Sequence, residues 1–348
     1  MTSGVPSVIV GATPTGHRIR QATADDLPTC AAIWRESLND YLGRLAQPDI
    51  PDDLGPILRL YEHLRSTDPT TFLVAEPTDG PLDGFIVVVR RGHMAFLSML
   101  FVRPAAQGRG LGRVLLDQAL PANVFAATAT AAAAGPGVGD AGGDGDESAV
   151  WWRATATDSV QPISNGLYGS LGLVPRIPLV RLVGLPDRPA DFGVLPGGVE
   201  PIAFDEIPSG SDGLAAAALT SELAALDRES IGFERTEDHA FQVREGRRGV
   251  LFRDRDGAAV GYGYAAESGR VGPIAVRDGA LLAPILGHLI RTVRPRGAFG
   301  LWLPGSAGTA IVPLLRAGFR FDGFPVLLCW DRPFGDLSRY LPMSPGLL

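Results

Sequence analysis

The sequence is poor in cysteine and has no strong excess of charge of one sign. Its 348 residues include two cysteines, Cys30 and Cys329, which stand far apart in apolar surroundings. This arrangement argues against a disulfide framework and a cysteine-based metal site, and it predicts two buried thiols in a reducing cytoplasm. The formal net charge is only −7, so the composition does not favour binding to nucleic acid or to an anionic membrane.

The sequence also lacks a long hydrophobic run. No apolar stretch reaches the roughly 18 residues of a membrane-spanning helix. Residues 1–16 have neither the basic start nor the long apolar run of a signal peptide. We therefore expect a cytoplasmic protein without a membrane segment, with residues 1–16 as a flexible tail. No metal site is expected, because His239 has no companions at ligand spacing.

Residues 95–118 carry the most specific pattern in the chain. The apolar run Ala95–Val102 predicts a buried strand, Pro104 ends it, and the glycine-rich turn Gln107–Gly112 leads into a leucine-rich helix. Backbone N–H groups at the start of a helix have no partner within the helix, and the helix dipole favours negative charge there. Glycines also let a phosphate approach the backbone closely. The stretch therefore predicts an anion-binding site.

The spacing of these glycines distinguishes between three kinds of phosphate-binding loop. A P-loop ends in Gly-Lys-Ser/Thr, whereas this turn continues as Gly112, Arg113 and Val114. The dinucleotide fingerprint needs G-x-G-x-x-G and a later acidic residue, but here the spacing is G-x-G-x-G and an alanine tract follows. A third pattern, Q/R-x-x-G-x-G/A, is matched at every defined position by residues 107–112. This turn, with its flanking strand and helix, resembles the coenzyme A loop of the GNAT N-acetyltransferase superfamily.

The resemblance implies an α+β (mixed α/β) fold, in which a mostly antiparallel sheet is flanked by helices. It implies acetyl-CoA as acyl donor and direct attack of an amine in a ternary complex, with no covalent enzyme intermediate. In the family, the pantetheine arm lies beside the fourth strand, and one strand N–H polarises the thioester carbonyl. The expected cofactor-binding residues are Leu100, Phe101, Val102, Gln107, Gly108, Arg109, Gly110, Leu111, Gly112, Arg113 and Gln161.

A tyrosine further along the chain is the expected general acid. The family often places it in the pattern N-x-x-x-x-x-x-Y, and Gln161 to Tyr168 has this spacing with glutamine in place of asparagine. The resemblance implies that Tyr168 protonates the leaving thiolate, and a buried core tyrosine is the alternative. Gln161 and Asn165 either contact the cofactor or form local caps and hydrogen bonds.

The general base is left open by the sequence. Many members of the family place a glutamate on the fourth or fifth strand, but the fourth strand of this chain has none. The candidates are Glu36 and Asp40 on the first predicted helix, His93, or a chain of ordered waters. A general base contributes typically 10²–10⁴-fold to a rate, so its absence would slow the transfer without abolishing it.

The length and the apolar fraction of 45% suggest two domains with sizeable cores. Residues 17–185 show the element order β-α-α-β-β-β-α-β-α-β of a GNAT domain. Within them, the glycine- and alanine-rich residues 126–148 predict a disordered loop. Residues 186–198 are the expected linker, residues 199–335 a second domain and residues 336–348 a tail.

The second predicted domain repeats the later elements of the first, and Leu315–Phe319 echoes Ser170–Leu173. The chain therefore resembles a tandem GNAT protein. Where the turn should recur, the second copy has Arg277-Asp278-Gly279-Ala280, and Asp278 would cap the helix and repel pyrophosphate. We expect this copy to be degenerate and to buttress the first domain or shape the acceptor pocket.

Two polar clusters in the second domain, 227–229 and 237–239, indicate either solvated helix ends or the lining of an acceptor pocket. The sequence favours an acetyl-CoA-dependent N-acetyltransferase, an acyltransferase acting on a small amine as a monomer or homodimer. A non-catalytic acyl-CoA sensor and a protein N-terminal or lysine acetyltransferase are the alternatives.

Overall fold

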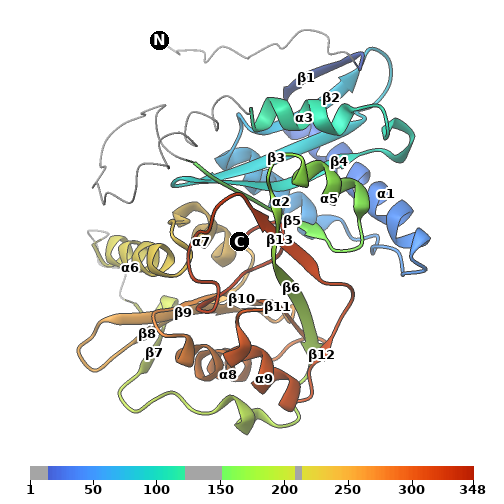
Figure 1. The fold of residues 1–348 in the computed structure, drawn as a ribbon. Helices are drawn as coiled ribbons and strands as arrows, with labels where there is room; N and C mark the ends of the chain where they lie inside the picture. Colours follow the sequence, from blue (N-terminus) through green and yellow to red (C-terminus); the bar gives the residue numbers. More distant parts are fainter. Residues whose placement is uncertain (1–14, 122–150, 208–213) are drawn as a thin grey trace. The chain divides into compact units, whose positions relative to one another are not determined.

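A computed structural model describes residues 15–121, 151–207 and 214–348. The chain divides into two compact units, Met1–Trp151 and Trp152–Leu348, called unit 1 and unit 2 below. The predicted disordered loop 126–148, and all but the last two residues of the predicted N-terminal tail, lie outside the described residues. Figure 1 labels most of the helices and strands of both units.

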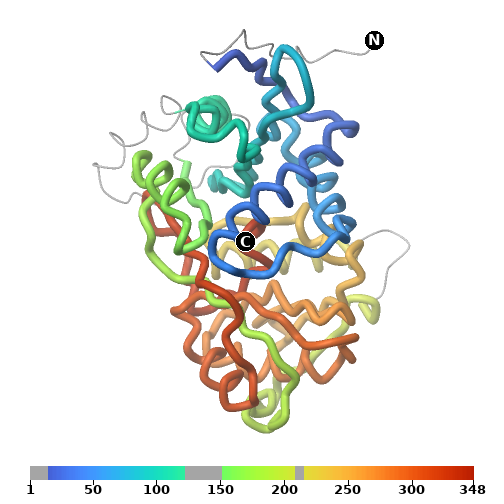
Figure 2. The backbone as a smooth tube through the Cα atoms, turned by 90° about the vertical axis from the view of Figure 1, so that its right-hand side faces the viewer, coloured from blue at the N-terminus to red at the C-terminus, as the bar shows by residue number. Residues whose placement is uncertain are grey.

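Unit 1 contains one antiparallel sheet with strand order β1-β2-β3-β4. Helix α3 packs on β2, β3 and β4, while α1 and α2 pack on each other and on the other side of these strands (Figure 2). The elements are β1 (His17–Gln21), η1 (Ala24–Asp26), α1 (Leu27–Arg44), α2 (Gly55–Thr67), β2 (Phe72–Pro77), β3 (Gly84–Arg91), β4 (Met94–Val102), η2 (Pro104–Ala106) and α3 (Leu111–Ala119).

The start of α1 is fixed by Asp26. Its Oδ2 accepts hydrogen bonds from the backbone N–H of Thr23 at 2.7 Å and from Thr23 Oγ1 at 2.8 Å. Arg20 donates to both carboxylate oxygens, at 2.6 and 2.9 Å. Burial by itself raises the pKa of Asp26, but the hydrogen bonds from Arg20 and Thr23 outweigh it and lower the pKa to about 2.

Unit 2 contains two sheets and the remaining helices. Its elements are β5 (Trp152–Asp158), α5 (Pro162–Gly169), β6 (Val174–Gly184), η3 (Pro189–Phe192), β7 (Glu200–Ala203), η4 (Phe204–Glu206), α6 (Leu214–Ile231), α7 (Thr236–Arg244), β8 (Arg248–Arg253), β9 (Ala259–Ala265), β10 (Val271–Val276), η5 (Gly279–Leu281), α8 (Leu282–Thr292), β11 (Phe299–Pro304), α9 (Gly308–Arg316), β12 (Arg320–Phe321), β13 (Val326–Trp330) and β14 (Tyr340–Leu341). One sheet has the order β14-β10-β9-β8-β7, with α6 and α7 on one side and α8 and α9 on the other (Figure 1).

The other strands of unit 2 have the order β5-β13-β6-β11, all antiparallel, and β12 pairs with β6 on the same edge as β13, opposite β11. Strand β13, from the end of the chain, lies between β5 and β6, which the sequence assigns to the first GNAT copy. Strand β6 in turn lies between β13 and β11, which belong to the second copy. The two copies therefore interleave their strands within one sheet.

The element order predicted for residues 17–185 is confirmed. The second copy repeats all ten elements, as β7, α6, α7, β8, β9, β10, α8, β11, α9 and β13. The sequence did not predict β7 or α7. The first is short, and the second buries Asp238, His239 and Gln242, so neither shows an apolar period. This complete repetition supports a duplicated chain.

Two segments differ from their sequence-based predictions. In the predicted linker, η3 buries the ring of Phe192 in the core of unit 2, against the ring of Phe319 and beside Gly287 of α8. Residues 336–348, predicted as a tail, include β14, which pairs with β10 and buries Tyr340 and Leu341. Both segments are ordered by apolar side chains that a count of prolines and glycines does not register.

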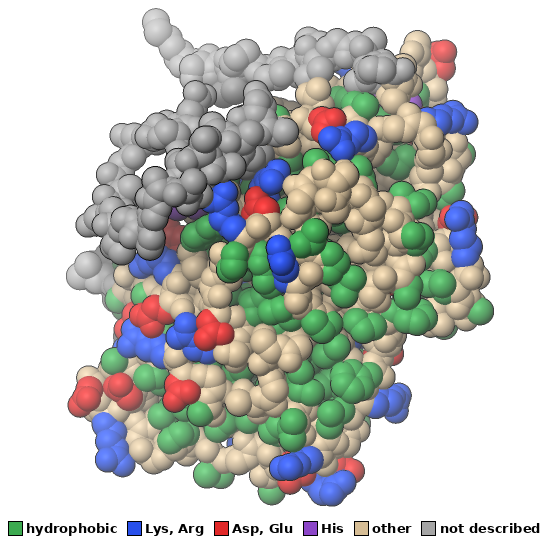
Figure 3. All heavy atoms as spheres, viewed as in Figure 1, with side chains coloured by type: hydrophobic (Ala, Val, Ile, Leu, Met, Phe, Trp, Pro, Cys, Tyr) green, Lys and Arg blue, Asp and Glu red, His purple; other side chains and the backbone are tan. Residues whose placement is uncertain are grey.

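A few large hydrophobic side chains are exposed on unit 2. They include Val312 and Leu315 on α9, and Phe321 and Phe324 around β12. Figure 3 shows hydrophobic side chains gathered over this part of the unit. Exposed apolar side chains are common on folded proteins, and none of these contributes to the site described next.

Candidate active site

The glycine-rich turn between β4 and α3 has the backbone of an anion-binding loop. Gly108 and Gly110 have φ angles of +77° and +84°, a region that favours glycine, and Gly110 is the N-cap residue of α3. Residues 107–110 are exposed. Within the described chain, no acceptor contacts the backbone N–H groups of residues 108–112. These groups therefore remain available to an anion at the positive end of the helix.

Two side chains hold this turn to the end of β4. The carbonyl oxygen of Val102 accepts a hydrogen bond from Nε2 of Gln107 at 2.8 Å. It accepts a second from Oγ of Ser37, a buried serine on α1, at 3.0 Å. The Gln107 side chain is thus directed back towards the strand, and its backbone N–H donates to Pro104 O at 3.3 Å. The Val102 carbonyl, with two bonds made, has no lone pair left for a cofactor amide.

Arg103 fixes the same junction from the other side. Its backbone N–H donates to Asp83 O and its Nε donates to Leu82 O, each at 2.8 Å. Its guanidinium also forms an ion pair with Glu36 on α1. The junction between strand and turn is therefore tied to α1 and to the turn before β3.

The register of β3 and β4 determines which backbone groups of β4 point away from β3. Because Arg103 bonds Asp83, the pair Phe101–Phe85 two residues earlier is also a hydrogen-bonded pair. The intervening residues Leu100 and Val102 direct their N–H and C=O groups to the opposite edge. The backbone N–H and C=O groups of Phe101, which was predicted as a cofactor contact, are therefore hydrogen-bonded to β3. The sequence alone does not show which residues of β4 face β3.

A β-bulge lies upstream in β4. Val87 pairs with Met99 and Val88 with Leu97, so Ser98 is an extra residue between them. Bulges bend a strand and re-aim its side chains, and they are frequent beside active sites. The bulge separates the part of β4 that holds Leu100 and Val102 from the part next to the β3–β4 turn, and both parts pair with β3.

The two arginines of the turn are exposed and differ in their contacts. Arg113 Nε lies 3.0 Å from Asp117 Oδ1, an ion pair across one helical turn. Arg109 has no ion pair with any residue that the structure describes. Arg109 is therefore the arginine better suited to meet a phosphate, although both remain predicted contacts.

Tyr168 and Gln161 belong to unit 2. The Tyr168 side chain is buried, which raises the pKa of its phenol, so the hydroxyl keeps its proton at neutral pH. Oε1 of Gln161 accepts from the Ile163 N–H at 3.1 Å and caps α5. Asn165 Nδ2 donates to the carbonyls of Asp158 and Gln161, at 3.0 and 2.7 Å. These contacts agree with the local alternative for Gln161 and Asn165.

The three side chains suggested as general base have the following surroundings. Glu36 is paired with Arg103, and Asp40 lies 2.6 Å from Arg44. His93 is exposed in the β3–β4 turn, where its ring meets the edge of Trp151 with centroids 6.4 Å apart. Both carboxylates are thus already engaged in ion pairs.

The second copy differs from the first at both ends of its site. Five residues, 277–281, join β10 to α8, whereas eight residues, 103–110, join β4 to α3. Asp278 caps η5, the short helix that leads into α8, because its Oδ1 accepts from the Ala280 N–H at 2.9 Å. An acidic side chain there repels an anion.

The helices α5 and α9 end in the same way, which aligns the two copies. Gly172 and Gly318 both have positive φ angles, and the next residues, Leu173 and Phe319, donate to Tyr168 O and Leu314 O respectively. Tyr168 therefore corresponds to Leu314. The second copy has neither the glycine turn nor the tyrosine.

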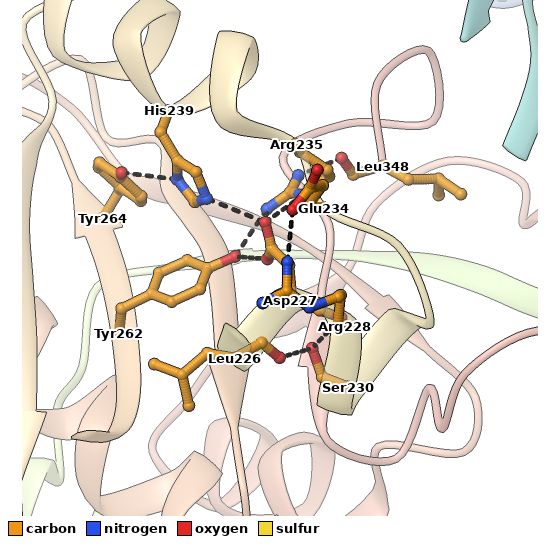
Figure 4. Close-up of polar contacts among 10 residues, drawn as sticks. All are labelled: Leu226, Asp227, Arg228, Ser230, Glu234, Arg235, His239, Tyr262, Tyr264 and Leu348. Atoms are coloured by element: carbon orange, nitrogen blue, oxygen red, sulfur yellow. Dashed lines mark hydrogen bonds and ion pairs between the residues drawn. The ribbon is translucent and has the colours of Figure 1, made fainter. Parts of the chain in front are cut away.

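The polar clusters around Asp227 and His239 form a buried network in unit 2 (Figure 4). Asp227 accepts from His239 Nε2 at 2.9 Å, from both Nε and Nη2 of Arg235 at 3.3 Å, and from the hydroxyl of Tyr262. The other ring nitrogen of His239 contacts Tyr264 Oη at 2.9 Å. Burial raises the pKa of Asp227, but the charges of Arg235 and His239 outweigh it and lower the pKa. The solvated helix ends predicted here are therefore wrong for Asp227 and His239.

Among the described residues, no group of histidine, cysteine and acidic side chains could hold a metal ion. In the same part of the chain, the helices are all too short or too polar to cross a membrane. Cys30 and Cys329 are free and buried, as predicted.

Comparison with known proteins shows what the turn and its flanking elements are similar to. The acetyltransferase (GNAT) domain model matches residues 68–136, which include β4, the turn and α3. A putative acetyltransferase from Pyrococcus horikoshii has the same fold over 96% of both chains, with a TM-score of 0.67 and 17% identity. A GCN5-related N-acetyltransferase from Sphaerobacter thermophilus covers 93% of this chain and 99% of its own, with a TM-score of 0.57 and 20% identity.

A tandem GNAT protein from the clavulanic acid biosynthesis pathway also matches, over 91% of this chain and 99% of its own, with a TM-score of 0.51 and 15% identity. A search of curated proteins found no significant match. The chain thus matches the GNAT acetyltransferase domain model over residues 68–136 and has the mixed α/β fold of these GNAT proteins, a tandem one included. The resemblance and the fold class predicted from the sequence are confirmed.

Proposed function

We propose that this protein transfers an acetyl group from acetyl-CoA to the amine of a small molecule, and that the first copy performs the reaction. The observation that carries the proposal is the exposed turn, whose N–H groups at residues 108–112 have no acceptor in the described chain. These groups would hold the pyrophosphate, with Arg109 adding positive charge. Leu100 and the N–H of Val102 offer backbone groups to the pantetheine arm and the thioester carbonyl.

In the proposed reaction, the amine nitrogen attacks the thioester carbonyl carbon, and the C–S bond breaks as the amide forms. Tyr168 would give its proton to the departing sulfur, which is then released as the free thiol, and the proton that the attacking nitrogen loses as the amide forms would restore the phenol. The ammonium proton of the acceptor must leave before attack, because an amine with a pKa near 10 is mostly protonated at neutral pH. The second copy, with Asp278 and Leu314 at the corresponding positions, would take no part in this chemistry.

The turn is tested by isothermal titration calorimetry with acetyl-CoA. The wild type should bind one molecule per chain, and Gly110→Glu should abolish binding, because it places a carboxylate where the phosphate would lie and a side chain at a positive φ angle. Gly80→Glu is the control: Gly80 also has a positive φ angle, in the exposed β2–β3 turn with no atom near its Cβ position. Equal binding by wild type and Gly110→Glu would remove the proposed site.

The tyrosine is tested by thiol release over a panel of small amines. Tyr168→Phe removes only the hydroxyl and should lower kcat by about 10²-fold or more with little change in acetyl-CoA affinity. Circular dichroism should show an unchanged fold, because the buried ring is kept. Turnover unaffected by this substitution would mean that another group or water protonates the thiolate.

One observation favours a second function, an acyl-CoA-binding sensor without catalysis. Glu36 and Asp40, the acidic candidates for the base, are both held in ion pairs. A sensor would bind acetyl-CoA in the calorimeter, would release no thiol with any amine of the panel, and would be indifferent to Tyr168→Phe.

A further inference from the structure

Arg247 is a buried cation without a carboxylate partner. It lies just before β8 with 7% of its surface exposed, and no residue in the described ranges forms an ion pair with it. A charged group taken out of water is costly unless it is paired. The other deeply buried arginines, Arg91 and Arg235, pair with Asp68 and Asp227. Arg247 is therefore the exception among them.

The guanidinium of Arg247 uses only part of its hydrogen-bonding capacity. Its Nη1 donates to the carbonyl oxygen of Gly272 at 2.5 Å. Its Nε is buried and has no partner, and its Nη2 donates to no described residue. Nε–H and Nη2–H point in parallel from one edge of the guanidinium, which is the fork that binds two oxygens of a carboxylate or phosphate.

A second arginine stands at the same end of the sheet. Strand β9 lies between β8 and β10: Arg248 pairs with Ala265, and the N–H of Ala266 donates to Arg270 O. Arg247 and Arg270 therefore lie at the same end of the sheet, one on each side of β9. Burial, and then the charge of Arg270, lower the pKa of Arg247 to about 10. An anion between the two side chains would offset both the loss of solvation of Arg247 and its repulsion by Arg270.

The remaining charged and titratable groups around Arg247 leave room for an anion. Glu245 is the acidic group whose charge favours the charged forms of Arg247 and Arg270, one negative charge beside two positive ones. Arg181, near Arg270, is paired with Asp322 at 2.6 Å. Tyr264, whose hydroxyl contacts His239, is buried and has a raised pKa, so it is uncharged at neutral pH. The local charge is therefore positive.

We propose that Arg247 and Arg270 form a binding site in unit 2 for a small oxyanion, the phosphate or carboxylate group of a ligand. The unused fork of Arg247 would hold two of its oxygens, and the more exposed Arg270, just before β10, would lie on its other side. The site is independent of the glycine turn and of the proposed acetyl transfer. It gives the second copy a ligand of its own, although this copy has no glycine turn.

Thermal unfolding of the full chain in inorganic phosphate tests this site, with sodium chloride keeping the ionic strength constant. Phosphate should raise the Tm of the wild type saturably, by about 2–4 °C. Arg247→Met should lose this part of the response, and Arg247→Lys should lose most of it, because an ammonium lacks the fork. Arg296→Met, at an exposed arginine beside Glu267, should respond like the wild type.

A rise in Tm that wild type and Arg247→Met share comes from phosphate bound at another site, for example at the glycine turn. An identical response of the two proteins, or no response of the wild type, overturns the proposal. If Arg247→Met does not fold, Arg270→Met replaces it: a reduced response supports the site, and an unchanged one overturns it. A parallel titration with acetate distinguishes the ligand groups, because a carboxylate site responds to acetate and a site for a tetrahedral anion responds to phosphate alone.

Discussion

Ser37 is a single hydroxyl on α1 that contributes to the turn through one carbonyl oxygen. We predict that Ser37→Ala weakens acetyl-CoA binding about fivefold, since losing a hydrogen bond of about 1 kcal/mol loosens the junction of β4 and the turn. Calorimetry measures the change. Ser66→Ala is the matched control, because Ser66 Oγ donates to His63 O on α2 at 2.7 Å, also within unit 1.

Ser37→Thr, which keeps the hydroxyl, should restore most of the affinity. If Ser37→Ala and Ser66→Ala both bind like the wild type, the hydroxyl on α1 plays no part in shaping the turn.

At the scale of single residues, the sequence predicts what is local. The glycines of the turn are readable because a phosphate loop is a short, contiguous pattern. Ser37 and Val102 lie 65 positions apart, so the local sequence around either residue does not predict their hydrogen bond. The side chain of Gln107 illustrates the same limit: the motif locates it, but only the fold shows that it bonds to Val102.

Among the elements, the start of α1 depends on one carboxylate. We predict that Asp26→Asn lowers the free energy of unfolding at pH 7 by about 2 kcal/mol, because the pKa of Asp26 lies near 2 in the folded chain and near 4 in an unfolded one. A lowered pKa stabilises the fold above the unfolded value and loses that effect as the pH falls through the folded value. The difference between variant and wild type should therefore shrink between about pH 4 and pH 2.

Urea unfolding over this pH range measures the difference. Asp25→Asn is the control, since Asp25 is an exposed neighbour in the same turn. A loss of stability that stays constant down to pH 2 would mean that the charge of Asp26 is not its cause.

The elements that the sequence predicts well are those with a regular apolar pattern or a recognisable end. The positive-φ glycines that end α5 and α9 appear in the sequence as an echo, and the structure confirms that both helices end alike. Helix α7 has no such pattern, because it buries Asp238, His239 and Gln242 on its inner face. Buried polar residues are satisfied by partners from other elements, here Asp227 and Tyr264 for His239, which no local pattern reveals.

At the scale of the whole molecule, the interleaved sheet changes how the duplication is understood. A local pattern predicts two copies with a linker between them, and the element order agrees with two copies. The pairing of strands is non-local, however, and it places β13 of the second copy between β5 and β6 of the first. This explains why β5, α5 and β6 belong to unit 2 although they complete the element order of the first copy. The domain boundary at residues 186–198 therefore remains a prediction.

We predict that residues 1–194, produced alone, do not form a folded GNAT copy. Without β13, strands β5 and β6 would each lose a partner and present an unpaired edge. Arg153 would also lose Asp331, whose Oδ2 lies 2.8 Å from its Nε. The full chain, cut at a protease site inserted after the exposed Val194, should instead stay together in size-exclusion chromatography and separate only in urea. A soluble, monomeric fragment 1–194 that binds acetyl-CoA as the full chain does would contradict the need for β13.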